Sequence, residues 1–469
     1  MTRKWWTLAA VGLGVFMLLL DITIVNVALP DIERSLDAGL SDLQWVVDAY
    51  ALSLAAFLLT AGSIGDRVGR RSVFATGIVI FTLGSLLCGL AGDPTVLALS
   101  RVVQGVGGAI MFATSLALLS TTYRGADRGV AFGVFGAITG VAVAVGPVLG
   151  GALTSGLSWR WIFFVNLPVG IVALLVTLRA VPETKDPHPR RLDWIGFVTF
   201  SAGLAMLVFG LIRSNEAGWG SAQVLGSLAA ALILLIAFAI AETLQREPMF
   251  DLSLFRVPTF VGGLIAAFGI SASLFSLLTY LVIYMQNLLG YSAIETGVRF
   301  LPLSLAIFFT AAIAGRLTAK VPTRFLIGPG FALIGVGLLL MRGLALDSSW
   351  TTLLAGLIVA GVGAGFVNVP LASTAVAVVE PARAGMASGV NSTFRQVGIA
   401  TGVAALGAIL AHAGPSTGRG PAAAQGFVDG LNEILLVGAV LAFATAVASL
   451  ALIRQRDFEH HTAAEPVPA

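Results

Sequence analysis

Three charged residues near the start of the chain stand inside otherwise apolar segments. Asp21 interrupts "LLLDITIVNVALP", Asp48 lies in "WVVDAY", and Arg101 lies in "LSRVVQGVGGA". A charged side chain is costly in an apolar stretch, and such residues normally face a cavity or one another. Desolvation disfavours a charged carboxylate while a nearby arginine favours it, so the two effects together permit reversible proton binding. These residues predict proton exchange by Asp21 and Asp48, and a purely structural ion pair with Arg101 is the alternative.

The composition places these charges in a membrane. Hydrophobic residues make up 57% of the 469 residues and charged residues 11%, and the mean hydropathy is +0.95. Soluble chains of this length are less apolar, whereas membrane spans of about 20 apolar residues give such values. The single cysteine, Cys88, excludes an internal disulfide. The net charge of +3 does not indicate a nucleic-acid partner, and the expected partners include membrane lipid.

Apolar runs alternate with polar breaks fourteen times along the chain, which predicts an all-α membrane protein with fourteen transmembrane helices. Their expected positions are 6–30, 42–64, 73–92, 95–119, 129–153, 161–181, 194–213, 222–243, 258–287, 294–315, 324–345, 350–378, 387–411 and 431–453. An even number of spans puts both termini on one side of the membrane.

The distribution of Lys and Arg over the loops predicts which side that is. Of the 27 basic residues, 19 lie in the termini and in the loops on their side. Six lie in the opposite loops, and two, Arg101 and Arg395, fall inside predicted spans. Because cytoplasmic loops carry the excess of basic residues, the sequence predicts a multi-pass protein of the cell membrane with cytoplasmic termini.

This orientation places the three buried charges at similar depth. At a rise of about 1.5 Å per residue, Asp21 lies about 13 Å from the outer end of its helix, and Asp48 and Arg101 about 9 and 10 Å from theirs. In the helix of Arg101, Gln104, Gly105 and Gly108 follow at i+3, i+4 and i+7 and share its face.

Two stretches of the second half repeat stretches of the first. Residues 61–71 superpose on 314–324, and 105–134 on 361–390, at nearly the same offset. The repeats predict two six-helix units with two inserted central helices, a design typical of secondary transporters that bind substrate between halves. The predicted divisions are an N-terminal bundle 1–181, inserted helices and linkers 182–257, a C-terminal bundle 258–454 and a cytoplasmic tail 455–469.

Small residues and aromatic residues mark two further features. The helix containing "GAITGVAVAVGPVLGG" has one face of small residues and a predicted bend at Gly146–Pro147. Aromatic residues at membrane depth, including Trp45 and Tyr50, would suit a pocket for flat cations, with ordinary aromatic packing as the alternative. Asn26 and Gln104 complete the candidates for proton or substrate binding.

Taken together, these motifs resemble the major facilitator superfamily. "GSIGDRVGRR" resembles its cytoplasmic loop between helices 2 and 3, "LSRVVQGVGGA" its helix 4 arginine motif, and "GVAVAVGPVLGG" its helix 5 antiporter motif. "LDITIVNVALP" and "WRWIFFVNLPVG" resemble the fourteen-span branch of drug:proton antiporters.

The resemblance implies roles for individual residues. Asp21 and Asp48 would serve proton and substrate binding, and Arg101 would assist proton transfer. The residues of the implied cytoplasmic gate are Gly62, Asp66, Arg67, Gly69, Arg70 and Arg71. Gly146 and Pro147 would form the seal that prevents leak, and the residues of the implied helix 5 antiporter motif are Gly136, Gly140, Gly146, Pro147, Gly150 and Gly151. Helix 13 departs from some family members, because it lacks acidic residues and instead carries Arg395.

The sequence therefore predicts a transporter rather than an enzyme. The expected function is proton-coupled export of hydrophobic, cationic or neutral small molecules by alternating access. No nucleotide-binding "GxxxxGK[ST]" loop occurs in the sequence, so ATP is not the expected energy source. The sequence also leads us to expect no cofactor and no metal. The alternatives are a dedicated exporter of one metabolite or antibiotic made by the host, an uptake symporter, or a proton-channel subunit. The last is disfavoured because the three lysines, Lys4, Lys185 and Lys320, all fall outside the predicted spans.

Overall fold

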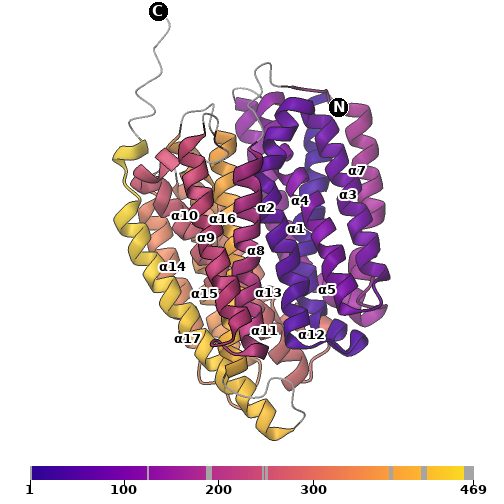
Figure 1. Ribbon diagram of the computed structural model, residues 1–469, viewed down its shortest axis with the longest axis vertical. Coiled ribbons are helices and arrows are strands. Elements are labelled where there is room, and N and C mark those ends of the chain that lie inside the picture. The colour runs from indigo at the N-terminus through magenta and orange to yellow at the C-terminus, as the bar shows by residue number, and fades with distance from the viewer. Residues whose placement is uncertain are drawn as a thin grey trace, which may run out of the picture.

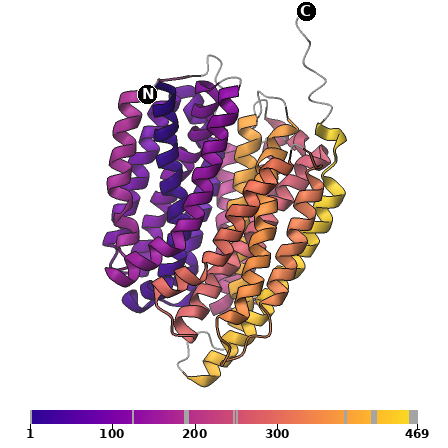
Figure 2. The same ribbon diagram turned by 180° about the vertical axis from the view of Figure 1, so that it is seen from behind.

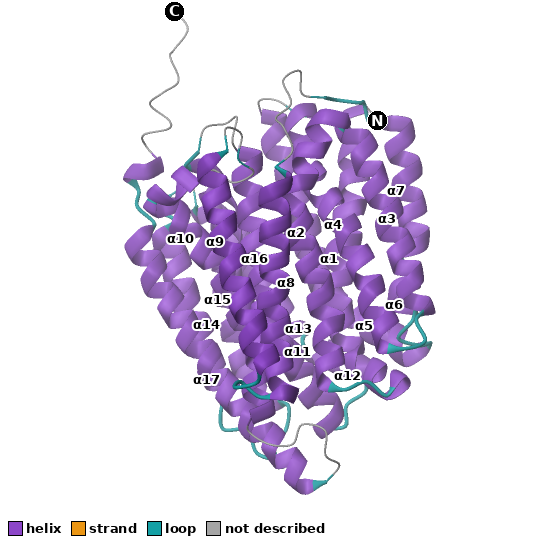
Figure 3. Ribbon diagram, in the orientation of Figure 1, coloured by secondary structure: helices purple, strands orange, loops and turns teal. Residues whose placement is uncertain are grey.

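The computed structural model describes residues 3–123, 126–185, 193–245, 248, 252–318, 320–379, 384–412 and 420–458. Within these residues the chain forms helices and loops only (Figure 3). The elements are α1 (Arg3–Leu36), α2 (Leu40–Val68), α3 (Arg70–Leu90), α4 (Pro94–Thr122), α5 (Ala126–Gly156), α6 (Trp161–Phe164), α7 (Asn166–Ala180), α8 (Trp194–Ala217), α9 (Ala222–Leu244), the 3₁₀ turn η1 (Leu252–Arg256), α10 (Pro258–Ile270), the π turn η2 (Ser271–Phe275), α11 (Ser276–Ile283), the π turn η3 (Tyr284–Leu288), α12 (Ala293–Arg299), α13 (Leu301–Leu317), α14 (Arg324–Leu340), α15 (Thr351–Ala377), α16 (Ala384–His412) and α17 (Pro421–Leu452).

The helices stand side by side in two groups. Helices α1 to α7 form one group and α10 to α17 the other, as Figures 1 and 2 show from opposite sides. Helix α8 contacts α2 of the first group and α16 of the second, and α9 packs on α8. The start of α1 and the end of α17 lie at the same end of the molecule, which we call the terminal end; the opposite end is the far end (Figure 1).

Eleven helices of the described residues are long and apolar enough to cross a membrane. Helices α2, α5 and α14, of 29, 31 and 17 residues, stand among them in the same two groups (Figure 1). The protein is therefore an all-helical, multi-pass membrane protein.

Prolines explain two of the three places where a predicted helix is divided; the third, 258–287, is divided by π turns into α10, η2, α11 and η3. The predicted helix 161–181 is divided into α6 and α7, and 294–315 into α12 and α13. Pro168 and Pro302 lie just after these breaks, and a proline cannot donate the hydrogen bond that would continue the helix. Pro30 lies inside α1, which continues to Leu36, and there the Arg34 Nε–H donates to the Pro30 carbonyl at 3.2 Å.

Short-range signals fix several helix starts. The Asp93 carboxylate accepts from the Val96 N–H at 2.9 Å and precedes Pro94, so α4 begins with a capping residue followed by proline. Ser292 and Glu295 form a reciprocal capping box at the start of α12.

The two helix groups are joined toward the far end. Hydrogen bonds that join Asn26, Val27, Glu33, Gln44 and Ser155 of the first group to the second group lie in that half of the molecule. Gln286 Nε2 donates to the Val27 carbonyl at 2.7 Å, and the Ile294 N–H donates to Ser155 Oγ at 3.1 Å. This arrangement closes the far end.

Candidate functional site

Asp21 and Arg101 form an ion pair inside the first helix group. Arg101 Nη1 lies 2.5 Å from Asp21 Oδ2, and the side chains are 2% and 0% exposed. Asp21 comes from α1 and Arg101 from α4, which run side by side. The pair is wholly enclosed by protein, so each charge depends on the other for its stability.

Amide side chains complete the coordination of this pair. Gln104 Nε2 donates to Asp21 Oδ1 at 2.7 Å, while Gln104 Oε1 accepts from Arg101 Nη1 at 2.7 Å. Asn166 Nδ2 lies 3.4 Å from Asp21 Oδ1 and 3.0 Å from Ser85 Oγ. Sequence reasoning assigned no role to Asn166 or Ser85. The available signal for Asn166 was an amide in the apolar run "FFVNLP".

Helix α2 contributes a carbonyl and an aromatic ring to the same cluster. Arg101 Nε donates to the Val46 carbonyl at 3.1 Å, and the Arg101 guanidinium carbon lies 4.1 Å from the centre of the Tyr50 ring. Tyr50 therefore contacts the ion pair through a cation–π interaction.

Asp48 has different surroundings from Asp21, although both were predicted at similar depth. It is fully buried, and neither of its carboxylate oxygens has a hydrogen-bond partner. One turn earlier on α2, Gln44 Nε2 donates to Tyr280 Oη at 3.1 Å and to the Val403 carbonyl at 3.2 Å, both in the second helix group. Since residues four apart share a helix face, Asp48 lies where the two groups meet.

The other candidates for substrate binding lie apart from one another. Asn26 Oδ1 accepts from Thr279 Oγ1 at 3.4 Å, across the two groups. The Trp45 ring lies 6.3 Å from the Phe209 ring of α8. Trp45 therefore faces α8 while Tyr50 faces Arg101, so the two do not form one wall of a pocket.

The predicted gate loop is bound to a distant linker. Helix α2 ends at Val68, Gly69 has a φ of 132°, and α3 begins at Arg70. The Glu183 carboxylate, beyond α7, accepts from the N–H groups of Arg71 at 3.0 Å and Ser72 at 3.2 Å.

Further contacts hold the same junction. Ser72 Oγ donates to Glu183 at 2.5 Å, and the Arg70 N–H donates to the Thr184 carbonyl at 2.9 Å. A Cβ added at Gly69 would lie 2.7 Å from the Glu183 carboxyl, so the glycine permits this close approach. Arg67 is exposed, and no heavy atom lies within 4 Å of a Cβ added at Gly62. The side chain of Asp66 lies outside the described residues.

Helix α5 uses its small residues for two different contacts. A Cβ added at Gly146 would collide with Thr23 of α1, and one added at Gly150 would collide with Ile24 of the same helix. One added at Gly151 would lie 2.5 Å from the Ala293 carbonyl oxygen of α12. The surroundings of Gly136 and Gly140 lie outside the described residues.

The α5–α12 contact is reciprocal. A Cβ added at Gly297 would collide with the Pro147 carbonyl oxygen. Backbone therefore meets backbone between the two helix groups at the far end, and this contact has no room for a side chain.

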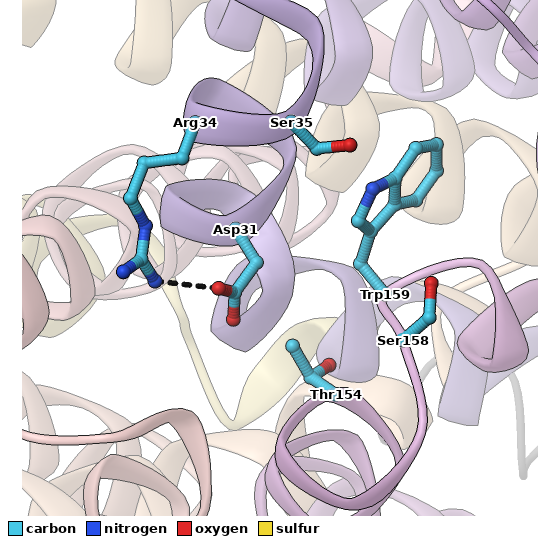
Figure 4. A pocket seen from close by; sticks show the side chains of 6 residues that line it. All are labelled: Asp31, Arg34, Ser35, Thr154, Ser158 and Trp159. Atoms are coloured by element: carbon cyan, nitrogen blue, oxygen red, sulfur yellow. Dashed lines mark hydrogen bonds and ion pairs between the residues drawn. The ribbon is translucent and has the colours of Figure 1, made fainter.

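A pocket of about 310 Å³ opens at the far end, beside the last turns of α1 (Figure 4). It is lined by Asp31, Arg34, Ser35, Thr154, Ser158 and Trp159. Asp31 lies ten residues beyond Asp21 on α1, about 15 Å along the helix, so the pocket is separate from the ion pair. In the described part of the chain, no group of three or more His, Cys, Asp or Glu residues has the arrangement of a metal site.

Comparison with known proteins identifies the family. The model of the Major Facilitator Superfamily matches residues 11–403 and 304–466. The chain is 37% identical over 406 residues to the multidrug resistance protein Stp of Mycobacterium tuberculosis, covering 86% of this chain and 75% of that protein. It is 36% identical over 466 residues to the puromycin resistance protein pur8 of Streptomyces alboniger, covering 97% and 92%.

A third relative and a solved structure agree with these matches. The tetracenomycin C resistance and export protein of Streptomyces glaucescens is 35% identical over 425 residues, covering 87% of this chain and 76% of that protein. The crystal structure of the human organic anion transporter MFSD10 superposes with a TM-score of 0.67 at 17% identity, covering 96% of this chain and all of that one, and supports the fold alone. The chain therefore belongs to the Major Facilitator Superfamily, a family of membrane transporters and not of enzymes.

Proposed function

We propose that the protein exports hydrophobic small molecules from the cell in exchange for protons, by alternating access. The names of three relatives, which are a multidrug resistance protein, an antibiotic resistance protein and an antibiotic export protein, support export as the direction. The sequence favours cationic or neutral substrates. A dedicated exporter of one host-made antibiotic is the second candidate, because two of these relatives are named for a single compound.

The observation that carries the proton coupling is Asp48. A buried carboxylate without a hydrogen-bond donor is very unfavourable in its charged form, and proton binding relieves that cost. Asp48 lies on the face of α2 that meets the second helix group, so movement of one group against the other changes its access to water. Protonation of Asp48 thereby favours the conformation with the closed far end, and that conformation in turn favours protonation of Asp48.

The Asp21–Arg101 pair has a supporting role in this proposal. It lies within one helix group, and its hydrogen bonds hold α1, α4 and α7 together. Its charges maintain a polar environment beside Tyr50 on the opposite face of α2 from Asp48. Arg101 is thus placed to assist proton transfer without direct contact with solvent.

We further propose that α2, α5 and α14 also cross the membrane, giving fourteen spans. Helices α8 and α9 then form the insertion between two six-helix units, and the terminal end is cytoplasmic. The loop from Gly62 to Arg71 acts as the gate at that end. The contacts across the two groups at the far end support an inward-facing state, in which substrate would enter from the cytoplasm.

The test is uphill transport in proteoliposomes with an imposed pH gradient, followed with the hydrophobic dye Hoechst 33342. Asparagine copies the shape of protonated Asp48 but cannot ionise. We expect Asp48→Asn to fold and bind the dye, but to lose transport driven by the gradient. Asp42→Asn is the matched control, because Asp42 lies on the same helix at its partly exposed start.

Uphill transport at the wild-type rate in Asp48→Asn would remove Asp48 from the coupling mechanism. Wild-type protein that transports the dye only down its gradient, with no response to pH, would overturn proton antiport altogether.

A further inference from the structure

Arg395 is an arginine at membrane depth that the mechanism above does not use. Its Nη2 donates to Asn368 Oδ1 at 2.5 Å, and the described residues give it no carboxylate partner. Arg101, by contrast, has Asp21 at 2.5 Å and also binds Gln104. Of the two arginines inside predicted spans, only Arg101 is therefore neutralised by the described part of the protein itself.

The position of Arg395 along α16 is deep in the membrane. It lies eleven residues after Ala384 and seventeen before His412, or about 16 Å and 25 Å along the helix. The hydrocarbon core of a bilayer is about 30 Å thick. A charged arginine at this depth is energetically costly and normally pairs with an anionic group. Such a residue therefore indicates a functional site.

Neighbouring residues show where the side chain points. Gly398 and Gly402 pack on the α10–η2–α11 segment, because a Cβ at either would collide with Phe268 or Ser276. Val403 and Gly407 face Gln44 of α2 instead. At about 100° per residue, Arg395 lies on the arc of α16 between these two faces. Arg395 therefore lies on the side of α16 that borders the region between the two helix groups. The residue is partly exposed, and its guanidinium contacts Asn368 of α15.

Asp48 approaches the same region from the other group. The hydrogen bond from Gln44 to the Val403 carbonyl puts these two residues at about the same height in the molecule. Asp48 lies four residues beyond Gln44 toward the terminal end, and Arg395 lies eight residues from Val403 in the same direction. The two charged residues therefore differ by about 6 Å in height. A molecule bound between the groups would meet both.

From these observations we infer that Arg395 and Asn368 form a substrate subsite for an oxyanion, a carboxylate or an ionised phenol or enol carried by an otherwise hydrophobic molecule. This inference rests on the proposed function of export, but it replaces the cationic or neutral substrates that the sequence favours with hydrophobic anions. A guanidinium offers five N–H donors in a planar fork that matches an oxyanion, and one of them is already used by Asn368. Asn368 holds the fork in place and keeps its own amide N–H₂ for the same ligand.

The subsite also explains how a positive charge is tolerated there. An anionic group brings its own negative charge and neutralises Arg395 while bound. A purely cationic substrate would be repelled by the same guanidinium, so the subsite disfavours it.

The experiment compares two fluorescent probes of nearly equal shape, 1-pyrenebutyrate and its methyl ester. Binding to the full-length protein in nanodiscs is followed by energy transfer from tryptophan to pyrene, with empty nanodiscs as the blank. We expect the wild type to bind the acid roughly tenfold more tightly than the ester, the difference that one charge-assisted hydrogen bond supplies.

Variants assign that preference to the subsite. Arg395→Gln should abolish it and leave ester binding unchanged, Arg395→Lys should keep part of it, and Asn368→Ala should reduce it. Arg316→Gln, at an exposed arginine near the end of α13, is the matched control and should keep it in full. If Arg395→Gln does not fold, as judged by thermal melting, Arg395→Lys and Asn368→Ala carry the test.

Three outcomes would overturn the inference. These are equal binding of acid and ester by the wild type, a preference that survives in Arg395→Gln, and a preference that appears only in Asp48→Asn. The last would mean that Asp48, not a ligand, is the partner of Arg395. Because binding is measured without a proton gradient, failure of the subsite remains distinct from failure of proton-coupled export.

Discussion

At the scale of residues, two carboxylates of the first helix group have opposite surroundings. Asp21 is bound by Arg101 and Gln104, whereas Asp48 has no hydrogen-bond donor.

Asp21→Asn would leave Arg101 charged and unpaired in the interior, so we expect the free energy of unfolding to fall by about 3–5 kcal/mol. The double change with Arg101→Gln should recover most of it. Thermal melting in detergent measures both, and Asp48→Asn should melt no lower than the wild type. A single Asp21→Asn variant as stable as the wild type would show that the pair contributes little.

At the scale of elements, Glu183 fastens the linker after α7 to the start of α3. Burial raises the pKa of Glu183, but hydrogen bonds from Ser72 and from the backbone N–H groups of Arg71, Thr184 and Ser72 together outweigh it and lower the pKa below its usual 4.5. A lowered pKa in the folded state means that the contact stabilises the protein above about pH 4.5 and that this stability is lost as pH falls through the folded-state value. We expect Glu183→Gln to cost about 1 kcal/mol at pH 7, a typical capping energy.

The same element-scale prediction has a pH signature. The difference in melting temperature between the wild type and Glu183→Gln should be constant near neutrality and shrink toward zero on acidification. Ser72→Ala keeps the carboxylate and its three backbone donors, so it should lose less at pH 7. A difference that persists unchanged in acid would mean that Glu183 acts through packing and not through its charge.

At the scale of the whole molecule, the far end must open if the two helix groups rock against each other. Ser155 and Ile294 meet across the groups at this end. A disulfide between Ser155→Cys and Ile294→Cys should therefore lock the far end closed and stop export, and a reductant should restore it. Cys88 is fully buried and can remain. Each single cysteine variant should export with or without oxidant. Normal export by the fully cross-linked protein would exclude opening at this contact.

Much of the fold was predictable because membrane spans are long and apolar. The helical class, most span positions and the family followed from hydropathy and motifs, while the fourteen-span count and the roles of individual residues remain predictions. The rise per residue of a helix put Asp21, Asp48 and Arg101 at similar depth in the membrane, but it could not give the direction of each side chain. On α2, Val46 and Tyr50 face Arg101 while Gln44 and Asp48 face the other group.

The contacts that the sequence did not predict join residues far apart in the chain. Glu183 binds residues more than a hundred positions earlier, and Asn166 reaches Asp21 across 145 positions. The amide of Asn166 in an apolar run indicated a buried polar group but not its partner, because hydrogen bonds between helices depend on packing that no short motif encodes.

The placement of α8 and α9 has a consequence for compounds dissolved in the bilayer. Large apolar side chains of α9, including Leu232, Ile233 and Ile236, are exposed and suited to acyl chains, while α8 contacts both α2 and α16. A lipophilic compound diffusing laterally toward the α2–α16 seam therefore meets this helix pair first. A compound that reaches the protein from the bilayer on this side has to pass around α8. The side of the protein covered by α8 and α9 therefore differs from its other sides in access from the lipid.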